Sequence, residues 1–141
     1  MLLEARIWDD AALVFADALK KRDTSYEAHV GLALAWTEQN RLREAQREAR
    51  VAVSLDPKRA RAHHVAADIY RRRKAYPEAI AEARQAVAIA PKDPVFRLGL
   101  ARVLEASGKT KEAVESYERF LAMVPDAAET RALRQHVRTL H

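Results

Sequence analysis

A spacing of 34 residues recurs along the chain and constrains its fold more than any other feature. Three segments align without gaps at this spacing, 26–59, 60–93 and 94–127. The equivalent positions hold small residues, large apolar residues and proline in turn: Ala33, Ala67 and Ala101; Trp36, Tyr70 and Leu104; Ala45, Ala79 and Ala113; Pro57, Pro91 and Pro125. A fixed period of this length indicates a chain built by stacking copies of one supersecondary unit.

Within each unit the apolar residues follow helical spacing. In the first complete unit we expect one helix over about 26–39 and a second over about 43–54. The break between them falls at Asn40, and asparagine tolerates the left-handed conformation that ends helices. Gly108 occupies the equivalent position two units later. Each unit is therefore expected to be a pair of antiparallel helices joined by a short turn.

The recurring alanines have a steric explanation. Two helices that cross closely leave no room for a longer side chain at the crossing point, so we expect Ala33 to face Ala45 and Ala67 to face Ala79. The larger residues of the column that begins with Trp36 are expected to fill the space toward the neighbouring helix.

Composition favours helix and excludes several kinds of protein. The chain has 3 Gly and 5 Pro among 141 residues, too few for a turn-rich β protein. With no Cys it offers no disulfide framework, zinc–thiolate site or thiol nucleophile. No apolar run approaches the ~18 residues of a membrane span, and the first residues do not form a secretory signal. We expect a cytoplasmic protein from the chain as given, which can itself be a piece of a longer one.

These features resemble the tetratricopeptide-repeat family. Its Leu is matched by Leu32 and Leu100, its Tyr by Tyr70, and its Ala and Pro by the columns given above. Its opening Trp is replaced here by His29, His63 and Arg97. The resemblance extends over about 9–127 and implies an all-α fold, a right-handed superhelix (solenoid) of antiparallel helix pairs.

The two ends of the chain depart from the complete units. We expect the leading segment to be a partial unit, with its second helix over about 9–21 and its first helix reduced to Met1–Ala5. The final helix is expected to act as a cap, with Leu133, Val137 and Leu140 turned inward. The resulting divisions are 1–25 (partial), 26–59, 60–93, 94–127 and 128–141 (capping helix).

Two interpretations of the leading partial unit stay open. In the first, the chain is a cut-out fragment or Leu2, Leu3 and Ile7 suffice as a short cap. In the second, apolar residues of this segment form an edge for self-association into a homo-oligomer. The residues of such an edge would be Leu2, Leu3, Ile7 and Phe15.

The resemblance also indicates where a partner would bind. In this family the first helices of the units line the concave surface of the superhelix. The groove then combines apolar residues, which would supply affinity for an extended peptide or a partner helix, with arginines that would orient a carboxylate. The alternative is that these residues form an ordinary solvated surface. The groove-lining residues are Glu27, Val30, Leu34, Glu38, Arg61, His64, Asp68, Arg71, Arg72, Leu98, Arg102 and Glu105.

One family subgroup captures the C-terminal carboxylate of chaperones with a clamp of Lys and Asn. That clamp is missing, so we expect a ligand of another class. The positions of its Lys and Asn hold Val30, Leu34, Val65, Val95 and Gly99 here.

We find no pattern that indicates catalysis or a cofactor. His64 and Asp68 lie one helical turn apart, but two ligands do not make a zinc site. His29 and His63 occupy equivalent positions that face between helices, which favours a structural role. The sequence has no Gly-rich phosphate loop and no Ser/His/Asp constellation. We expect a non-catalytic interaction scaffold without metal or cofactor.

The net charge of +5 does not by itself indicate a nucleic-acid partner. The excess comes from segment 60–93, with seven Lys/Arg against four Asp/Glu, and from 128–141, with three against one. Within the first of these, Arg71–Lys74 end a helix, where cations interact favourably with the helix dipole. The groove columns contain no aromatic residue on which bases would stack. We therefore expect a protein partner rather than nucleic acid.

Overall fold

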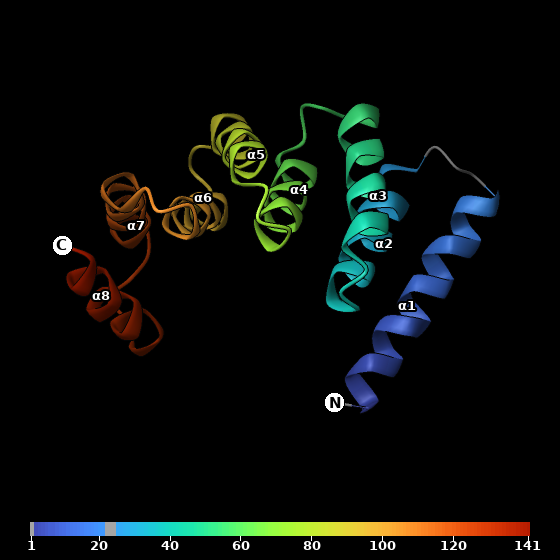
Figure 1. The fold of residues 1–141 in the computed structure, drawn as a ribbon, viewed down its shortest axis with the longest axis horizontal. Coiled ribbons are helices and arrows are strands. Elements are labelled where there is room, and N and C mark those ends of the chain that lie inside the picture. Colours follow the sequence, from blue (N-terminus) through green and yellow to red (C-terminus); the bar gives the residue numbers. More distant parts are fainter. Residues whose placement is uncertain (1, 22–24) are drawn as a thin grey trace.

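The computed structural model of the chain describes residues 2–21 and 25–141, and the side chains of 4–17 and 25–141. Over this described part it is entirely α-helical, without a strand. Successive helices form an arch with α1 at one end and α8 at the other (Figure 1). The helices are α1 (Leu2–Lys21), α2 (Tyr26–Glu38), α3 (Leu42–Leu55), α4 (Ala60–Arg72), α5 (Tyr76–Ile89), α6 (Pro94–Ala106), α7 (Thr110–Met123) and α8 (Ala128–Leu140).

The helix pairs of the three complete units agree closely with those expected from the repeat. The pairs are α2 with α3, α4 with α5, and α6 with α7, and in each case the two helices contact each other. The expectation for the leading segment was wrong in one respect. Residues 2–21 form one unbroken helix, with no boundary between Ala5 and Asp9. Arg6, Ile7 and Trp8 include no glycine or proline, so nothing in the local sequence interrupts the backbone hydrogen bonds there.

The turn inside each unit uses a left-handed residue at one repeat position. Asn40, Lys74 and Gly108 have φ angles of 60°, 61° and 85°. After each of them the next backbone N–H reaches back five residues: Arg41 to the Trp36 carbonyl, for example, over 2.8 Å. This is the Schellman arrangement, which satisfies carbonyls that a helix end leaves unpaired.

The core runs along the arch as three clusters of buried residues. The expected alanines lie within these clusters, and Ala33, Ala45 and Ala79 are 0% exposed. The first cluster lies around Leu32, the second around Ile69 and the third around Leu100. The large residues connect them, since Trp36 packs against the first and second clusters and Tyr70 against the second and third. The burial of the small residues and the position of the large ones between clusters agree with the steric interpretation of the two kinds of column.

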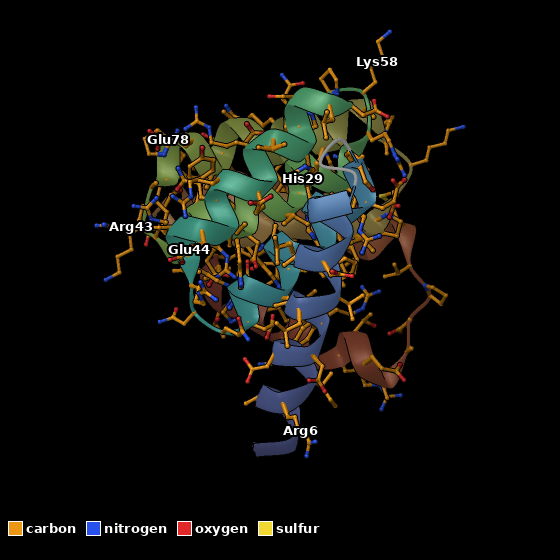
Figure 2. All side chains as sticks on the ribbon, turned by 90° about the vertical axis from the view of Figure 1, so that its right-hand side faces the viewer. Arg6, His29, Arg43, Glu44, Lys58 and Glu78 are labelled. Atoms are coloured by element: carbon orange, nitrogen blue, oxygen red, sulfur yellow. The ribbon has the colours of Figure 1, made fainter. Side chains whose placement is uncertain are left out.

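Buried histidines hold the paired helices together in two of the units. His29 Nδ1 lies 2.5 Å from Glu48 Oε2, and His63 Nδ1 lies 2.6 Å from Glu82 Oε2. Each histidine is only 6% exposed. Figure 2 shows His29 among the helices, whereas Lys58 at the molecule's edge extends into solvent. These contacts fit the structural role expected for the two histidines.

Helix α8 covers the far end of the last core cluster, as a capping helix should. Val137 is 4% exposed and belongs to that cluster, and Leu133 and Leu140 pack against it. Glu105 of α6 accepts hydrogen bonds from Tyr117 Oη at 2.6 Å and from His136 Nε2 at 2.8 Å. Burial and the bond to this carboxylate raise the pKa of Tyr117. In the described part of the chain no helix is both long and apolar enough to cross a membrane.

Candidate binding groove

The first helices of the three units, α2, α4 and α6, form a continuous row. Helix α4 contacts both α2 and α6, and it lies on the inner side of the arch beneath α5 (Figure 1). Two cavities open along this row, one between α4 and α6 and one where α1 meets α2 and the start of α4. We call them the α4–α6 cavity and the α1–α2 cavity.

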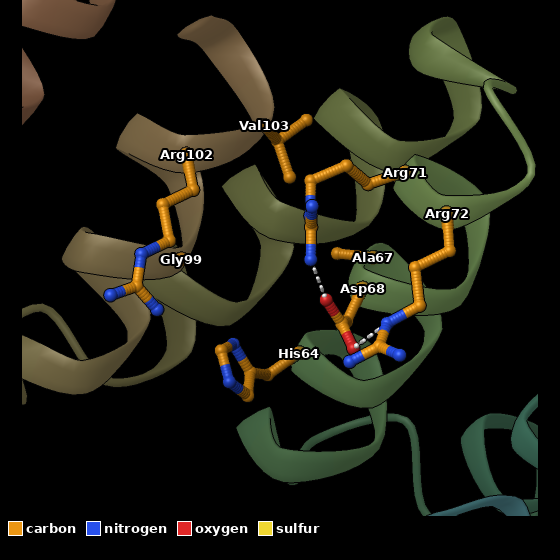
Figure 3. A pocket seen from close by; sticks show the side chains of 8 residues that line it. All are labelled: His64, Ala67, Asp68, Arg71, Arg72, Gly99, Arg102 and Val103. Atoms are coloured by element: carbon orange, nitrogen blue, oxygen red, sulfur yellow. Dashed lines mark hydrogen bonds and ion pairs between the residues drawn. The ribbon is translucent and has the colours of Figure 1, made fainter. Parts of the chain in front are cut away.

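The α4–α6 cavity has a volume of about 260 Å³ and is lined mainly by charged residues. Figure 3 shows Arg102 of α6 on one side and Arg71 and Arg72 of α4 on the other. Asp68 and His64 lie between them. The remaining lining residues, Ala67, Gly99 and Val103, are small or apolar.

A single carboxylate organises two of the three arginines. Arg71 Nη2 donates to Asp68 Oδ1 at 2.5 Å, and Arg72 Nε donates to Asp68 Oδ2 at 3.1 Å. Arg72 also lies 3.8 Å from Glu38 of α2. Arg102 forms no ion pair with any described carboxylate. The lining thus holds three guanidinium groups and one carboxylate, with a second carboxylate, that of Glu38, close to Arg72, so positive charge is in excess.

His64 forms the wall of this cavity at its boundary with α6. Its ring meets Phe96 edge to face, with centroids 5.3 Å apart. It also lies over Gly99, where an added Cβ would come within 2.7 Å of His64 Cε1. Burial lowers the pKa of His64, and Arg102 lowers it further, while Asp68 and Asp93 oppose the shift.

The α1–α2 cavity has a volume of about 360 Å³ and a more apolar lining. Trp8 and Phe15 of α1 stand over Gly31 and Leu34 of α2, and the Phe15 ring occupies the place where a Gly31 side chain would be. Its other lining residues are Tyr26, Glu27, Val30, Arg59 and Arg61.

Ionic contacts frame the apolar part of this cavity. Arg59 lies 4.1 Å from the centroid of the Tyr26 ring and donates to Glu27 Oε1 at 2.8 Å. That hydrogen bond is the main reason why the pKa of Glu27 is lowered. Arg61 forms no ion pair with any described carboxylate.

The structure divides the expected groove residues between these two cavities. His64, Asp68, Arg71, Arg72 and Arg102 line the α4–α6 cavity. Glu27, Val30, Leu34 and Arg61 line the α1–α2 cavity, and Glu38 lies between the two through its contact with Arg72.

Three of the expected groove residues serve the interior of the fold more than its surface. Val30 is a buried residue of the second core cluster and also lines the α1–α2 cavity. Leu98 is half-buried against the third cluster. Glu105 accepts hydrogen bonds from α7 and α8.

Sequence reasoning missed the contribution of α1. Trp8 and Phe15 bring aromatic rings to the α1–α2 cavity from outside the groove columns, which themselves hold no aromatic residue. These rings pack against α2 rather than standing free. A signal was present in Gly31 and Gly99, two glycines at one repeat position in helices that otherwise avoid glycine. Both receive a ring from a neighbouring helix.

The structure describes the side chains of two of the four residues expected to form a self-association edge. Ile7 is 57% exposed, but Phe15 packs against α2. The side chains of Leu2 and Leu3 lie outside the described residues. Two further residues of α1 join Ile7 at the surface, Leu13 at 69% and Val14 at 66% exposure. Among the described residues, no group of three or more His, Asp or Glu is placed to hold a metal ion.

Comparison with known proteins agrees with the repeat architecture. Two models described as tetratricopeptide repeat match the chain, one over 70–137 and the other over 2–45 and 37–94. No curated protein sequence matches significantly.

Several solved structures have a similar fold. MamA, at 20% identity, aligns over 94% of this chain and 84% of its own with a TM-score of 0.77. MamA 41-end from Desulfovibrio magneticus RS-1, at 19%, aligns over 86% and 69% with a TM-score of 0.77. YrrB, described as a TPR protein with an unusual peptide-binding site, aligns at 22% over 80% and 58% with a TM-score of 0.70. Since one of these family models matches more than half of the chain's length, the chain belongs to the tetratricopeptide-repeat family.

Proposed function

We propose that the chain is a protein-interaction scaffold whose ligand, an extended peptide or a partner helix, lies along α2, α4 and α6. The family in general consists of non-catalytic interaction modules. The observation that carries the proposal is the pair of cavities of opposite character on one row of helices. A protein of similar fold, YrrB, is described as having a peptide-binding site.

The two cavities would make different contributions to peptide binding, one to affinity and the other to orientation. The α1–α2 cavity offers apolar surface from Trp8, Phe15 and Leu34, whose burial by a ligand side chain would supply affinity. The α4–α6 cavity offers directed cationic hydrogen-bond donors, which fix orientation more than they add affinity. A ligand that spans both would be held in one direction along the groove.

A peptide-display selection on the full chain tests this proposal without a known partner. Peptides enriched on the wild-type chain are then measured against the double variant Leu34→Glu/Arg71→Glu, one change in each cavity. The matched control is Arg47→Glu/Val51→Glu on α3, which makes the same two kinds of change at exposed positions outside both cavities. We expect at least ten-fold weaker binding by the groove variant and binding within two-fold of wild type by the control.

Far-ultraviolet circular dichroism shows whether each variant keeps its helices. Equal binding of the enriched peptides by a folded groove variant and by the wild type would refute the groove. So would a selection that enriches no peptide.

Self-association through α1 is a second candidate, favoured by one observation. Ile7, Leu13 and Val14 are more than half exposed on a single helix, and apolar surface gathered in this way marks interaction sites. Sedimentation velocity over a concentration series would show an oligomer that Leu13→Lys/Val14→Lys converts to a monomer. Val95→Lys, at another exposed valine, serves as control. A wild-type chain that remains monomeric at the highest concentration would end this candidate.

A further inference from the structure

We infer that the α4–α6 cavity is the subsite for an acidic side chain, the carboxylate of an Asp or Glu in the bound peptide. This inference rests on the proposed peptide groove and specifies the chemistry of its ligand. It predicts that binding sequences carry an acidic residue in addition to the residue that fills the apolar α1–α2 cavity.

The arginines of the cavity keep unused hydrogen-bond donors. Asp68 accepts one hydrogen bond from Arg71 and one from Arg72, and each guanidinium has five N–H donors. Arg102 donates to no described carboxylate. The cavity therefore keeps donor capacity on both of its walls, and carboxylates are the groups that arginine binds most favourably in pairs of hydrogen bonds.

Two of the guanidinium groups are preorganised by Asp68. Because Asp68 holds both Arg71 and Arg72, these long side chains do not have to be ordered when a ligand binds. Guanidinium groups already fixed in place lose less entropy on binding than free ones. Asp68 thus acts as a positioning residue that aligns two donors, not as a competitor that neutralises all three cations.

The cavity has the size of a single side chain. A volume of about 260 Å³ accommodates a side chain but falls below that of cavities that enclose a whole small molecule. Small residues form its floor, and Gly99 leaves the space that the His64 ring occupies. Among the described residues the lining includes no Phe, Tyr or Trp on which a nucleobase would stack, and Phe96 packs against His64.

His64 gives this subsite a dependence on pH. The charged groups that act on it are Asp68 of its own helix, Asp93 before α6 and Arg102 of α6. A bound carboxylate adds a negative charge near the ring and stabilises the imidazolium form. Binding therefore takes up a proton, and affinity for a carboxylate rises as the pH falls from about 7.5 toward 6, where the ligand itself is still ionised.

The test uses small probes on the full ¹⁵N-labelled chain, observed by NMR. The probes are N-acetyl-glutamate α-methylamide, which carries a side-chain carboxylate, and its neutral glutamine analogue. N-acetyl-glycine supplies a terminal carboxylate, and inorganic phosphate a different anion. We expect saturable shifts of the Gly99 and Asp68 amides with the glutamate probe, and none with the glutamine probe.

Variants locate the binding. Arg102→Gln should weaken the glutamate probe at least five-fold, whereas Arg47→Gln on the exposed face of α3 should leave it within 1.5-fold. His64→Gln should abolish the gain in affinity between pH 7.5 and 6. Equal shifts with the glutamine probe, or no shifts at all, would overturn the inference. Tighter binding of N-acetyl-glycine or of phosphate would also overturn it, by assigning the cavity to a chain terminus or to a phosphorylated or nucleic-acid ligand.

The failure of this inference is distinguishable from that of the groove. Displayed peptides that bind wild type and not the Leu34→Glu/Arg71→Glu variant, yet contain no acidic residue, would refute the acidic subsite and leave the groove standing. If no displayed peptide depends on the groove, the proposed function itself fails, whatever the probes show.

Discussion

At the residue scale, the repeat shows what each side chain contributes because equivalent positions can be compared within one molecule. Two units join their helices with a His–Glu contact, His29 with Glu48 and His63 with Glu82. The next unit has Arg97 at the histidine position, and this arginine donates to the Pro91 carbonyl at 3.2 Å. His63 Nε2 donates to the equivalent carbonyl, that of Pro57, at 2.8 Å. This repeat position thus keeps its hydrogen bond to the loop before the first helix in both units, whereas the ion-pair contact to the second helix is made by histidine.

The His63–Glu82 contact should contribute measurably to stability. Glu82→Ala leaves a buried ring nitrogen without its partner, which costs about 1–3 kcal/mol of the free energy of unfolding. Glu78→Ala, at an exposed position on the same helix, should cost no more than about 0.5 kcal/mol. Urea unfolding of both variants checks this, and equal losses would contradict a specific role for Glu82.

His64 should make stability depend on pH. Burial lowers its pKa in the folded chain below the ordinary value of 6.5, so the unfolded chain binds more protons between those two values. The contribution of His64 is therefore fully present above pH 6.5 and is lost as the pH falls below it. His64→Gln should flatten the loss of unfolding free energy between pH 7.5 and 5, measured by urea unfolding. A variant with the slope of the wild type would contradict this.

The sequence predicted which arginines gather but not what shapes their cavity. Arg71 and Arg72 follow Asp68 at helical spacing, and Arg102 lies at the repeat position of Asp68, so their proximity follows from period and register. The aromatic wall of the α1–α2 cavity does not follow, because it depends on the angle at which α1 approaches α2. The 34-residue repeat does not fix that angle, because α1 is a single helix that contacts α2 and is not one of the helix pairs of the complete units.

At the element scale, the turns show how tolerant the repeat is of its local sequence. The left-handed position after the first helix holds Asn40, Lys74 and Gly108 in successive units. Asparagine and glycine adopt this conformation readily, and lysine does so at a steric cost. The sequence signal was therefore clear in two of the units, while in the other the turn follows from the repeat and not from its own residue.

Replacing that lysine should stabilise the chain. Lys74→Gly removes the strain between Cβ and backbone at a φ of 61°, which is about 1 kcal/mol. Gly108→Ala, the reverse change at the equivalent position, should destabilise by a similar amount. Thermal unfolding checks both signs. A Lys74→Gly variant that melts below the wild type would contradict the assignment of strain.

The contact of α1 with α2 should depend on the absence of a side chain at residue 31. Gly31→Ala forces the Phe15 ring out of its place, which costs about 1–3 kcal/mol and outweighs the gain of about 1 kcal/mol from better helix propensity. In a Phe15→Ala background the same change should be neutral or stabilising. This double-mutant cycle, measured by urea unfolding, would contradict the contact if the two effects simply add.

At the scale of the whole molecule, the fold is a line of units in which each helix contacts only near neighbours along the chain. The proposed groove therefore combines short contributions from several units, from α2, α4 and α6, and α1 contributes to the lining of the α1–α2 cavity. Because the small residues of the repeat are used for internal crossings, the residues between them are free to vary and to determine what binds. The period thus predicts the row of helices, and the residues within it determine the character of each cavity.

The most direct measurement of the central claim is a map of where a ligand lies. A displayed peptide enriched on the wild-type chain is titrated into the ¹⁵N-labelled protein, and the backbone amide shifts are recorded. We expect the largest amide shifts along α2, α4 and α6, including residues that line the two cavities, such as Leu34 and Gly99. Shifts gathered on the outer helices α3, α5 and α7 instead would contradict it.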